Sequence, residues 1–349
     1  MPHVVWPLSE RSAVDARAVG EDAGVEGLPF DVSLYHVNAD MMETVWRSLP
    51  RGAEAGRFRI GYWFWELSHF PLALAEAFSR VDEVWAPSRF CEEAYRVLAP
   101  VEVRWVPPCV PEPTLEPTVE AGGAATRAEL GIPPGAFLFF FAFDALSVPE
   151  RKNPEGLLAA FGLAVRDSPV PLHLLLKVRG AEVEPGLGER LERLAAGLPV
   201  TLLHQTLARR ELTALTAACD AYVSLHRSEG LGLPLIEALY LGKPVIATGY
   251  GGVTDFLDAE TGWPVRSSPV ALARPAGPYP RGAVWAEPDV EHAAACMVEV
   301  ASDPAAAAER AAAGCRRVRE LYAPAAAGRR LRGELLRICG QAISAPPTS

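Results

Sequence analysis

Short apolar segments alternate with amphipathic segments along the first third of the chain. Runs rich in Val, Ile, Phe, Tyr and Trp predict strands over 3–8, 30–37, 57–66, 81–87 and 101–107. The apolar spacing between them predicts helices over 12–24, 71–80 and 89–98. Ser88 is placed to cap the last of these helices, because its hydroxyl can accept from a first-turn amide.

The alternation continues with more regularity in the second part. Strands are expected over 137–143, 171–177, 199–203, 220–225 and 244–248, and helices over 154–166, 187–196, 209–218 and 233–241. Residues 266–288 are rich in proline and are expected to form a loop with a buried Trp285. Alanine- and arginine-rich periodicity then predicts helices over 289–302, 304–322 and 325–343.

Strand–helix alternation of this kind predicts parallel sheets with right-handed crossovers. The expected domains are 1–108, a linker rich in proline, glycine and threonine over 109–134, a second domain over 135–325, and a helix over 326–349 that would return to the first domain. Ligands of doubly wound sheets bind beyond the carboxyl ends of the strands. The turns that follow the strands, and a cleft between the domains, are therefore where a site is expected.

Composition narrows the classes of function. The 349 residues are half apolar and carry a formal net charge of −10, which disfavours a broad nucleic-acid surface. The six cysteines are scattered without a CxxC pair, so neither a disulfide framework nor a zinc site is expected. The amino terminus lacks the pattern of a signal peptide, and no apolar run is long enough to cross a bilayer. We expect a cytoplasmic protein, and nothing in the sequence indicates its oligomeric state.

The segment HRSEGLGLPLIE over 226–237 carries the strongest chemical pattern. Gly230 and Gly232 allow the backbone to approach a ligand closely, and Pro234 suits the first turn of a helix. The amides of Leu231, Gly232 and Leu233 would then point out of the helix start, where aligned N–H groups and the helix dipole attract anions. A pyrophosphate fits such a terminus.

Two carboxylates bracket this turn. Glu237 lies about one turn into the helix, where it could accept hydrogen bonds from a vicinal diol such as a ribose. Glu229 precedes the turn, on the expected sugar side of the phosphates. Acidic residues are common near helix starts because the dipole favours them, and that reading suffices for either glutamate alone. The pair, flanking two glycines and a proline, favours a binding function.

Cations and a second glycine turn add to the pattern. Arg151 and Lys152 follow the strand at 137–143 and could neutralise a departing diphosphate, and Lys177 ends the next strand. Gly251 and Gly252, in GYGG after a strand, could offer further amides. Taken alone, an Arg-Lys pair is usually a solvated loop and a Gly-Gly turn is usually only a turn.

The whole ordered set resembles the retaining glycosyltransferase family 4 of the GT-B fold. The family signature has two glutamates separated by seven residues, here EGLGLPLIE, followed by ALYLGKPVIATGYGGVTDFLDAETGWPV. The resemblance extends to ERKNPEGLLAAF, IGYWFWELSHFP, VDEVWAPSRF and VRWVPPCV, and it covers most of the chain from about Leu34 onward. It implies an α/β fold with two Rossmann-like, doubly wound domains facing a cleft and with C-terminal helices closing the chain.

The resemblance also implies roles for individual residues. Glu237 would hold the nucleotide ribose, Glu229 would lie near the transferred sugar, and Arg151 and Lys152 would contact the donor diphosphate. The family usually has an arginine soon after the first strand of this domain; Asp144-Ala145 stands there, so Arg151 is a substitute. Further candidates complete the expected site: His204, Gln205 and Leu207 for the base, His226 for the sugar or for packing alone, and Glu66 or His69 from the first domain for catalysis.

The expected activity is metal-independent transfer of a hexosyl unit from a nucleoside diphosphate sugar, with retention, as in bacterial glycoconjugate or natural-product biosynthesis. The acceptor would be a glycan, a lipid-linked molecule or a small molecule, and no cofactor is expected. No Asp-x-Asp motif occurs, which disfavours the metal-dependent type of transfer. Two other readings stay open: a GT-B phosphorylase or sugar-nucleotide epimerase, and a non-catalytic subunit that binds a sugar nucleotide or a glycan. The first domain is short for this fold and its first turn, PLSERSAVDAR, lacks a glycine-rich loop.

Overall fold

A computed structural model describes residues 31–49, 57–115 and 127–344, and the expected strand at 3–8 and helix at 12–24 lie outside these residues. The chain divides into two compact units. Unit 1 comprises Met1–Trp65, His69–Pro107 and Arg329–Ser349, and unit 2 comprises Glu66–Ser68 and Pro108–Gly328. The linker expected over 109–134 lies partly outside the described residues, and its extent stays a prediction.

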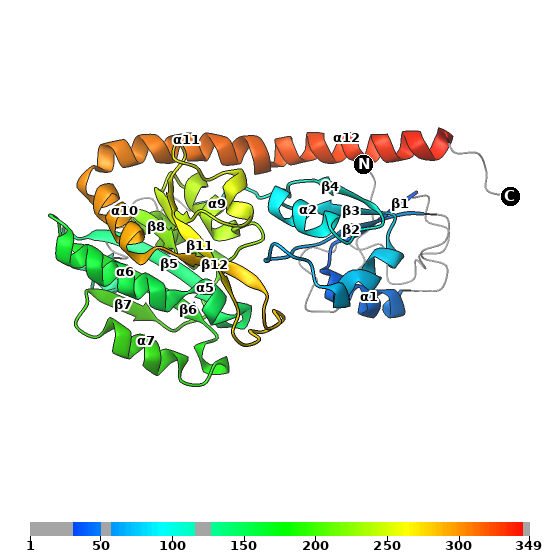
Figure 1. The fold of residues 1–349 in the computed structure, drawn as a ribbon. Helices are drawn as coiled ribbons and strands as arrows, with labels where there is room; N and C mark the ends of the chain where they lie inside the picture. Colours follow the sequence, from blue (N-terminus) through cyan, green and yellow to red (C-terminus); the bar gives the residue numbers. More distant parts are fainter. Residues whose placement is uncertain (1–30, 50–56, 116–126, 345–349) are drawn as a thin grey trace. The chain divides into compact units, whose positions relative to one another are not determined.

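Unit 1 contains a parallel sheet in the order β1-β2-β3-β4 (Figure 1). Its strands are β1 (Val32–Tyr35), β2 (Phe58–Tyr62), β3 (Glu83–Ala86) and β4 (Glu102–Trp105). The connecting elements are η2 (Ala39–Met41), α1 (Met42–Ser48), η3 (Leu72–Arg80) and α2 (Arg89–Arg96). Ser88 caps α2 as expected, with its hydroxyl 3.2 Å from the Cys91 amide.

Two elements of unit 1 differ from the sequence prediction. The helix expected over 71–80 is the 3₁₀ helix η3 (Leu72–Arg80). Only Ala77 and Phe78 of η3 are buried, and i→i+3 bonds close the turns at its two ends. Helix α1 was not predicted, although Met42 and Val45, three residues apart, form its buried face.

The core of unit 1 includes a residue from the far end of the chain. Ile338 of α12 (Pro324–Ser344) packs in a buried cluster with Ile60, Tyr62, Trp85 and Val106. Hydrophobic burial of this kind holds the carboxyl-terminal part of α12 on the unit 1 sheet.

Unit 2 contains a larger parallel sheet in the order β10-β9-β8-β5-β6-β7 (Figure 1). Its strands are β5 (Phe137–Asp144), β6 (Leu172–Arg179), β7 (Val200–Leu203), β8 (Ala221–Ser224), β9 (Val245–Thr248) and β10 (Trp263–Val265). The chain adds β6 and β7 on one side of β5 and then returns to add β8, β9 and β10 on the other. The direction of winding therefore switches between β5 and β8, which is where ligands bind in such sheets.

The helices of unit 2 lie close to their predicted positions. They are α5 (Pro149–Lys152), α6 (Pro154–Asp167), α7 (Leu187–Ala195), α8 (Arg209–Ala218), α9 (Leu233–Tyr240), α10 (Val290–Ser302) and α11 (Pro304–Tyr322), with short 3₁₀ turns η4 (Ala145–Ser147), η5 (Ala181–Val183) and η6 (Gly252–Asp255). Helix α10 packs on α6, and α11 packs on α9.

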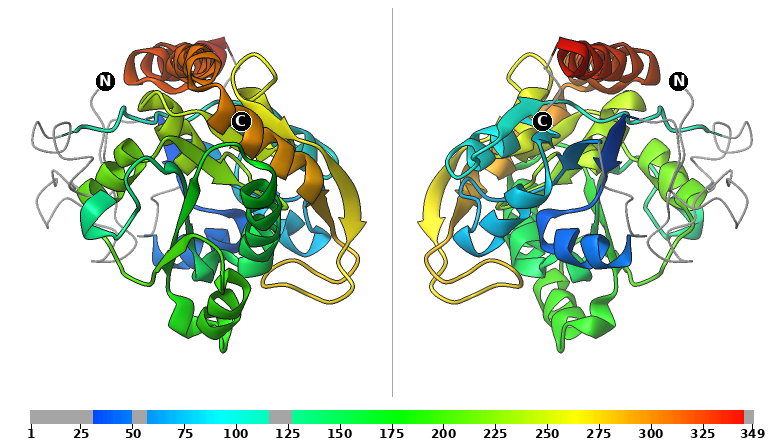
Figure 2. Two further views of the ribbon diagram at one scale, coloured as in Figure 1. Left: turned by 90° about the vertical axis from the view of Figure 1, so that its left-hand side faces the viewer. Right: turned by 90° about the vertical axis from the view of Figure 1, so that its right-hand side faces the viewer.

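The expectation of a loop over 266–288 is wrong. The segment forms an antiparallel hairpin of β11 (Ser267–Ala271) and β12 (Val284–Pro288), visible in Figures 1 and 2. Every residue of β11 is exposed, so the strand lacks the apolar alternation that marks a half-buried strand, and Pro269 is tolerated because the ribbon has open edges. Trp285 is buried, as predicted.

Candidate active site

Strand β5 leads into a compact turn that carries two cations. Asp144 ends the strand, and its carboxylate accepts from the Leu146 amide at 3.0 Å. Pro149 then starts the single helical turn α5, which carries Arg151 and Lys152. Asn153 ends α5 with φ 53°, and its amide group donates to the Leu225 carbonyl at 2.9 Å. The turn after β5 is thereby tied to the end of β8.

Arg151, Lys152 and Glu229 form one cluster at this junction. The Lys152 ammonium donates to Glu229 Oε1, and Arg151 Nη1 lies 3.3 Å from Glu229 Oε2. Arg151 also donates to the Ser228 carbonyl at 2.9 Å. The three side chains are only 5–14% exposed, so their charges act on one another with little screening by water.

This environment sets the protonation state of Glu229. Burial alone would raise the pKa of its carboxyl, but Lys152 and Arg151 outweigh burial and lower the pKa to about 2. Burial lowers the pKa of Lys152, and Glu229 offsets part of that decrease. The cluster thus holds two cationic side chains against one carboxylate, an arrangement suited to an anionic ligand.

Helix α9 begins at Leu233, shortly after Glu229 in the chain. Gly232 has φ 88°, which favours glycine, and no side chain caps the helix that begins at Leu233. The first amides of a helix have no acceptor within the helix, so those at this terminus can serve a ligand. Leu231 is buried and Leu233 is exposed.

Glu237 is placed one turn into α9 and has a partner that the sequence did not reveal. Arg209, at the start of α8, donates to its Oε1 at 2.7 Å. Burial raises the pKa of Glu237, and Arg209 offsets part of that rise. His204, Gln205 and Leu207 precede α8 in the loop after β7, and the first two of these side chains are exposed.

The glycine turn after β9 packs against the Glu229 segment. The Gly252 amide donates to the Glu229 carbonyl at 2.7 Å, so this amide is occupied and does not serve as the expected phosphate donor. A Cβ on Gly251 would lie 2.4 Å from the Glu229 carbonyl oxygen, and one on Gly252 would lie 2.0 Å from that of Gly230. Both glycines permit a close backbone approach that fixes the position of Glu229.

His226 packs in the interior. It is fully buried, its Nδ1 lies 3.1 Å from Ser224 Oγ, and its Nε2 lies 3.3 Å from the Tyr250 carbonyl oxygen. A carbonyl can only accept, so Nε2 carries the proton. Burial lowers the pKa of His226 to about 4, and the ring is neutral near pH 7. Of the two roles considered for this residue, the structure supports packing.

The remaining sequence candidates are more scattered. Lys177 is buried near the end of β6, where burial lowers its pKa, with a further decrease from Arg179 and an opposing effect of Asp144. Glu66 groups with unit 2, where it accepts from the Tyr279 hydroxyl at 3.0 Å. His69 belongs to unit 1, and its carbonyl accepts from Trp65 Nε1.

Two residues near the cluster escaped the sequence analysis. Tyr279 lies in the β11–β12 hairpin and is 3% exposed. Arg227 donates to the Glu150 carbonyl at 2.6 Å and pairs with Glu287 of β12. Arg227 lies within the 226–237 segment singled out above, and Tyr279 lies in the 266–288 segment that was expected to form a loop.

The region that carries this site is similar to known glycosyl transferases. Residues 139–276 match the family model described as glycosyl transferases group 1. That region contains the whole Arg151–Lys152–Glu229 cluster and helix α9.

Curated relatives match a similar part of the chain. The D-inositol 3-phosphate glycosyltransferase of Streptomyces scabiei is 32% identical over 166 residues, which cover 45% of this chain and 36% of the relative. The trehalose synthase of Pyrococcus horikoshii is 38% identical over 66 residues, covering 19% of this chain and 16% of the relative. The chain thus spans about a third of the length of the first of these relatives and less of the second.

Solved structures extend the likeness to most of the fold. Sucrose-phosphate synthase from Thermosynechococcus elongatus superposes with a TM-score of 0.64 at 21% identity, over 88% of this chain and 74% of that one. HepE from Anabaena, in complex with UDP, superposes with a TM-score of 0.64 at 16% identity, over 87% of this chain and 79% of that one. The predicted GT-B fold class, with two Rossmann-like sheets and C-terminal helices, is confirmed.

Among the described residues, no cluster of His, Cys, Asp and Glu side chains has the geometry of a metal site. No helix in the same part of the chain has the length and apolar character needed to span a membrane.

Proposed function

We propose that this protein transfers a hexosyl unit from a nucleoside diphosphate sugar to an acceptor hydroxyl, with retention at the anomeric carbon and without a metal ion. The observation that carries the proposal is the buried Arg151–Lys152–Glu229 cluster at the point where the unit 2 sheet reverses its winding. The match to glycosyl transferases group 1 over the same region supports it.

The Arg151–Lys152–Glu229 cluster and the first amides of α9 would together bind the donor diphosphate. Preplaced cations stabilise the negative charge that develops on a leaving diphosphate, and here Arg151 and Lys152 are held in place by their own hydrogen bonds. Amides at Leu231–Leu233 would bind the phosphate oxygens, since the helix dipole favours an anion there. Glu229 keeps the cations paired when no donor is bound and would lie beside the sugar when one is.

Glu237 would hold the ribose. Its carboxylate can accept from both hydroxyls of a diol, and the hydrogen bond from Arg209 offsets part of the pKa rise that burial causes. The loop at His204, Gln205 and Leu207 leads into the helix that carries Arg209 and would contact the base. Lys177, at the end of the neighbouring strand β6, would add positive charge on this side.

In the transfer step, the bond between the anomeric carbon and the diphosphate oxygen breaks as the acceptor hydroxyl attacks from the same face. The electron pair of the broken bond leaves with the diphosphate, whose charge Arg151 and Lys152 stabilise. The acceptor proton passes to a leaving-group oxygen, so the step needs no additional reactant.

The test is a thermal-shift screen with UDP, GDP, ADP and their sugars, followed by assays of nucleotide release and of transfer with the ligands that bind. A ligand that binds the native state raises its apparent stability. Binding of one diphosphate series together with nucleotide release is the expected result. Isomerised donor without release would indicate an epimerase, dependence on inorganic phosphate a phosphorylase, and binding without turnover a non-catalytic subunit. No binding at all would end the proposal.

A further inference from the structure

The tip of the β11–β12 hairpin rests against the turn that carries the two cations. Ala276 and Tyr279 exchange backbone hydrogen bonds of 2.9 and 3.0 Å, which closes a tight turn over Gly277. A Cβ on Gly277 would lie 2.5 Å from Val148 Cγ2, so the backbone of the tip touches the residue that precedes α5. This contact fixes Tyr279 close to Arg151.

A second contact fixes the base of the hairpin to the same turn. Arg227 forms a bidentate pair with Glu287 of β12 at 2.6 and 2.8 Å. The same guanidinium donates to the Glu150 carbonyl of α5 at 2.6 Å and lies 5.6 Å from the Trp285 ring centroid. Bidentate guanidinium–carboxylate pairs have a defined geometry, so the hairpin and α5 hold a fixed relation.

The Tyr279 side chain bonds to Glu66 and lies within electrostatic reach of Arg151. Its hydroxyl donates to Glu66 Oε2 at 3.0 Å, and the side chain is 3% exposed. Burial raises the pKa of this hydroxyl far above its usual range, although Arg151 opposes the rise, so the group keeps its proton. Arg151 and Lys152 both experience the Glu66 charge, yet in the described part of the chain Glu66 forms no ion pair with either.

We propose that Tyr279 is a positioning residue: its hydroxyl holds the Glu66 carboxylate away from Arg151 and Lys152, so that both cations remain available to a diphosphate. The inference rests on the proposed function, because a diphosphate is the ligand for which the cations are kept. A buried or half-buried carboxylate that loses its donor is costly to leave unpaired, and pairing with a neighbouring cation would relieve that cost. Two carboxylates would then compete with the ligand where one does now.

The experiment uses inorganic pyrophosphate as the probe, with its affinity measured by titration calorimetry on the full chain. Y279F removes only the hydroxyl and is expected to weaken pyrophosphate binding about tenfold, the size of one hydrogen bond to a charged group. E66Q in the Y279F background is expected to restore the wild-type affinity, because the competing charge is then absent. Y62F is the matched control: this buried hydroxyl donates to the Val106 carbonyl at 2.8 Å in unit 1, and its loss is expected to leave the affinity unchanged.

Each outcome decides the inference. A double variant that binds as weakly as Y279F would assign Tyr279 a merely structural role and overturn it, as would a Y279F protein with wild-type affinity or a wild-type protein that does not bind pyrophosphate. If Y279F does not fold, E66Q alone replaces it and is expected to bind pyrophosphate at least as tightly as wild type; weaker binding contradicts the inference. The proposed function fails separately, when the wild-type protein binds pyrophosphate as expected but turns over no nucleotide sugar.

Discussion

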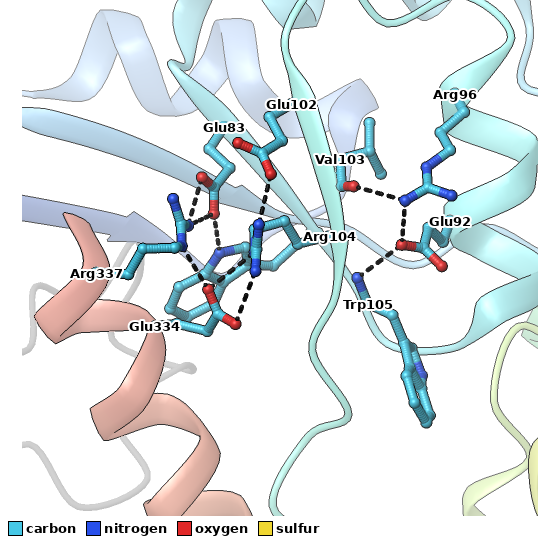
Figure 3. A network of polar contacts seen from close by, with 10 residues as sticks. Glu83, Glu92, Arg96, Glu102, Val103, Arg104, Trp105, Glu334 and Arg337 are labelled. Carbon is cyan, nitrogen blue, oxygen red and sulfur yellow. Dashed lines mark hydrogen bonds and ion pairs between the residues drawn. The ribbon is translucent and has the colours of Figure 1, made fainter. Parts of the chain in front are cut away.

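Both units bury ion pairs, and the two networks are built differently. In unit 1, the Glu83 carboxylate is 1% exposed and accepts from Arg337 at 2.7 and 2.6 Å and from Trp85 Nε1 at 2.7 Å (Figure 3). Glu334 links Arg337 to Arg104 within the same network. Glu83 thus accepts from Arg337 and Trp85, and Glu334 accepts from Arg337 and Arg104. The network joins α12 to strands β3 and β4.

In unit 2, by contrast, two cations converge on the single carboxylate of Glu229. This cluster lies at the reversal of the sheet and beside a glycine turn, whereas the unit 1 network lies between a helix and the strands it covers. Removing one partner of a buried ion pair is strongly destabilising, whereas two cations that share one carboxylate at a strand-end turn suit an anionic ligand. The two networks should therefore respond to mutation in different ways.

The largest expected effect is on activity, from Lys152→Met. Loss of a preplaced cation from the leaving group should lower the transfer rate about 10³-fold, as for other single donors to a developing charge. Steady-state kinetics with the donor found in the screen measures this change. Lys243→Met is the control. Within the described residues, the Lys243 ammonium donates to a single group, the Cys219 carbonyl, at 2.8 Å. Equal losses in the two variants would contradict the role of Lys152.

Arg337→Met should affect stability and not nucleotide binding. It leaves Glu83 buried without its cation, which costs about 3 kcal/mol of unfolding free energy for unit 1. Urea unfolding followed by tryptophan fluorescence gives the change. Arg47→Met, which removes an exposed pair with Glu43, should change stability by less than about 0.5 kcal/mol. If Arg337→Met abolished diphosphate binding while the chain stayed folded, the contrast between the two networks would be wrong.

The smallest expected effect is the pH dependence from His226. Its folded pKa of about 4 lies below the ordinary value of 6.5, so the unfolded chain binds the proton first. Stability from this group is complete above pH 6.5 and is lost as the pH falls toward 4, by about 2 kcal/mol between pH 7 and pH 5. The difference in unfolding free energy between wild type and His226→Asn, measured at both pH values, isolates this contribution. If the unfolding free energy of His226→Asn fell as much as that of wild type between pH 7 and pH 5, the lowered pKa assigned to His226 would be wrong.

Local features of the chain were enough to predict most of the elements. The predicted helices at 209–218 and 304–322 agree with α8 and α11, since proline starts, caps and apolar spacing act within a few residues. The pattern at 229–237 likewise placed Gly232 at the helix start and Glu237 one turn on. The hairpin at 267–288 was missed because its first strand is wholly exposed, so no apolar alternation marks it.

The sequence by itself therefore determined most of the strands and helices, the glycine turn before α9 and the residue types able to bind a diphosphate, because backbone preference and side-chain period are local properties. Only the tertiary structure decided which of those residues meet. The sheet order brings Arg151 to Glu229, the start of α8 lies where Arg209 reaches Glu237, and the hairpin brings Tyr279 to Glu66. Each pair joins segments far apart in the chain, and no local pattern encodes a contact that depends on how separate elements pack.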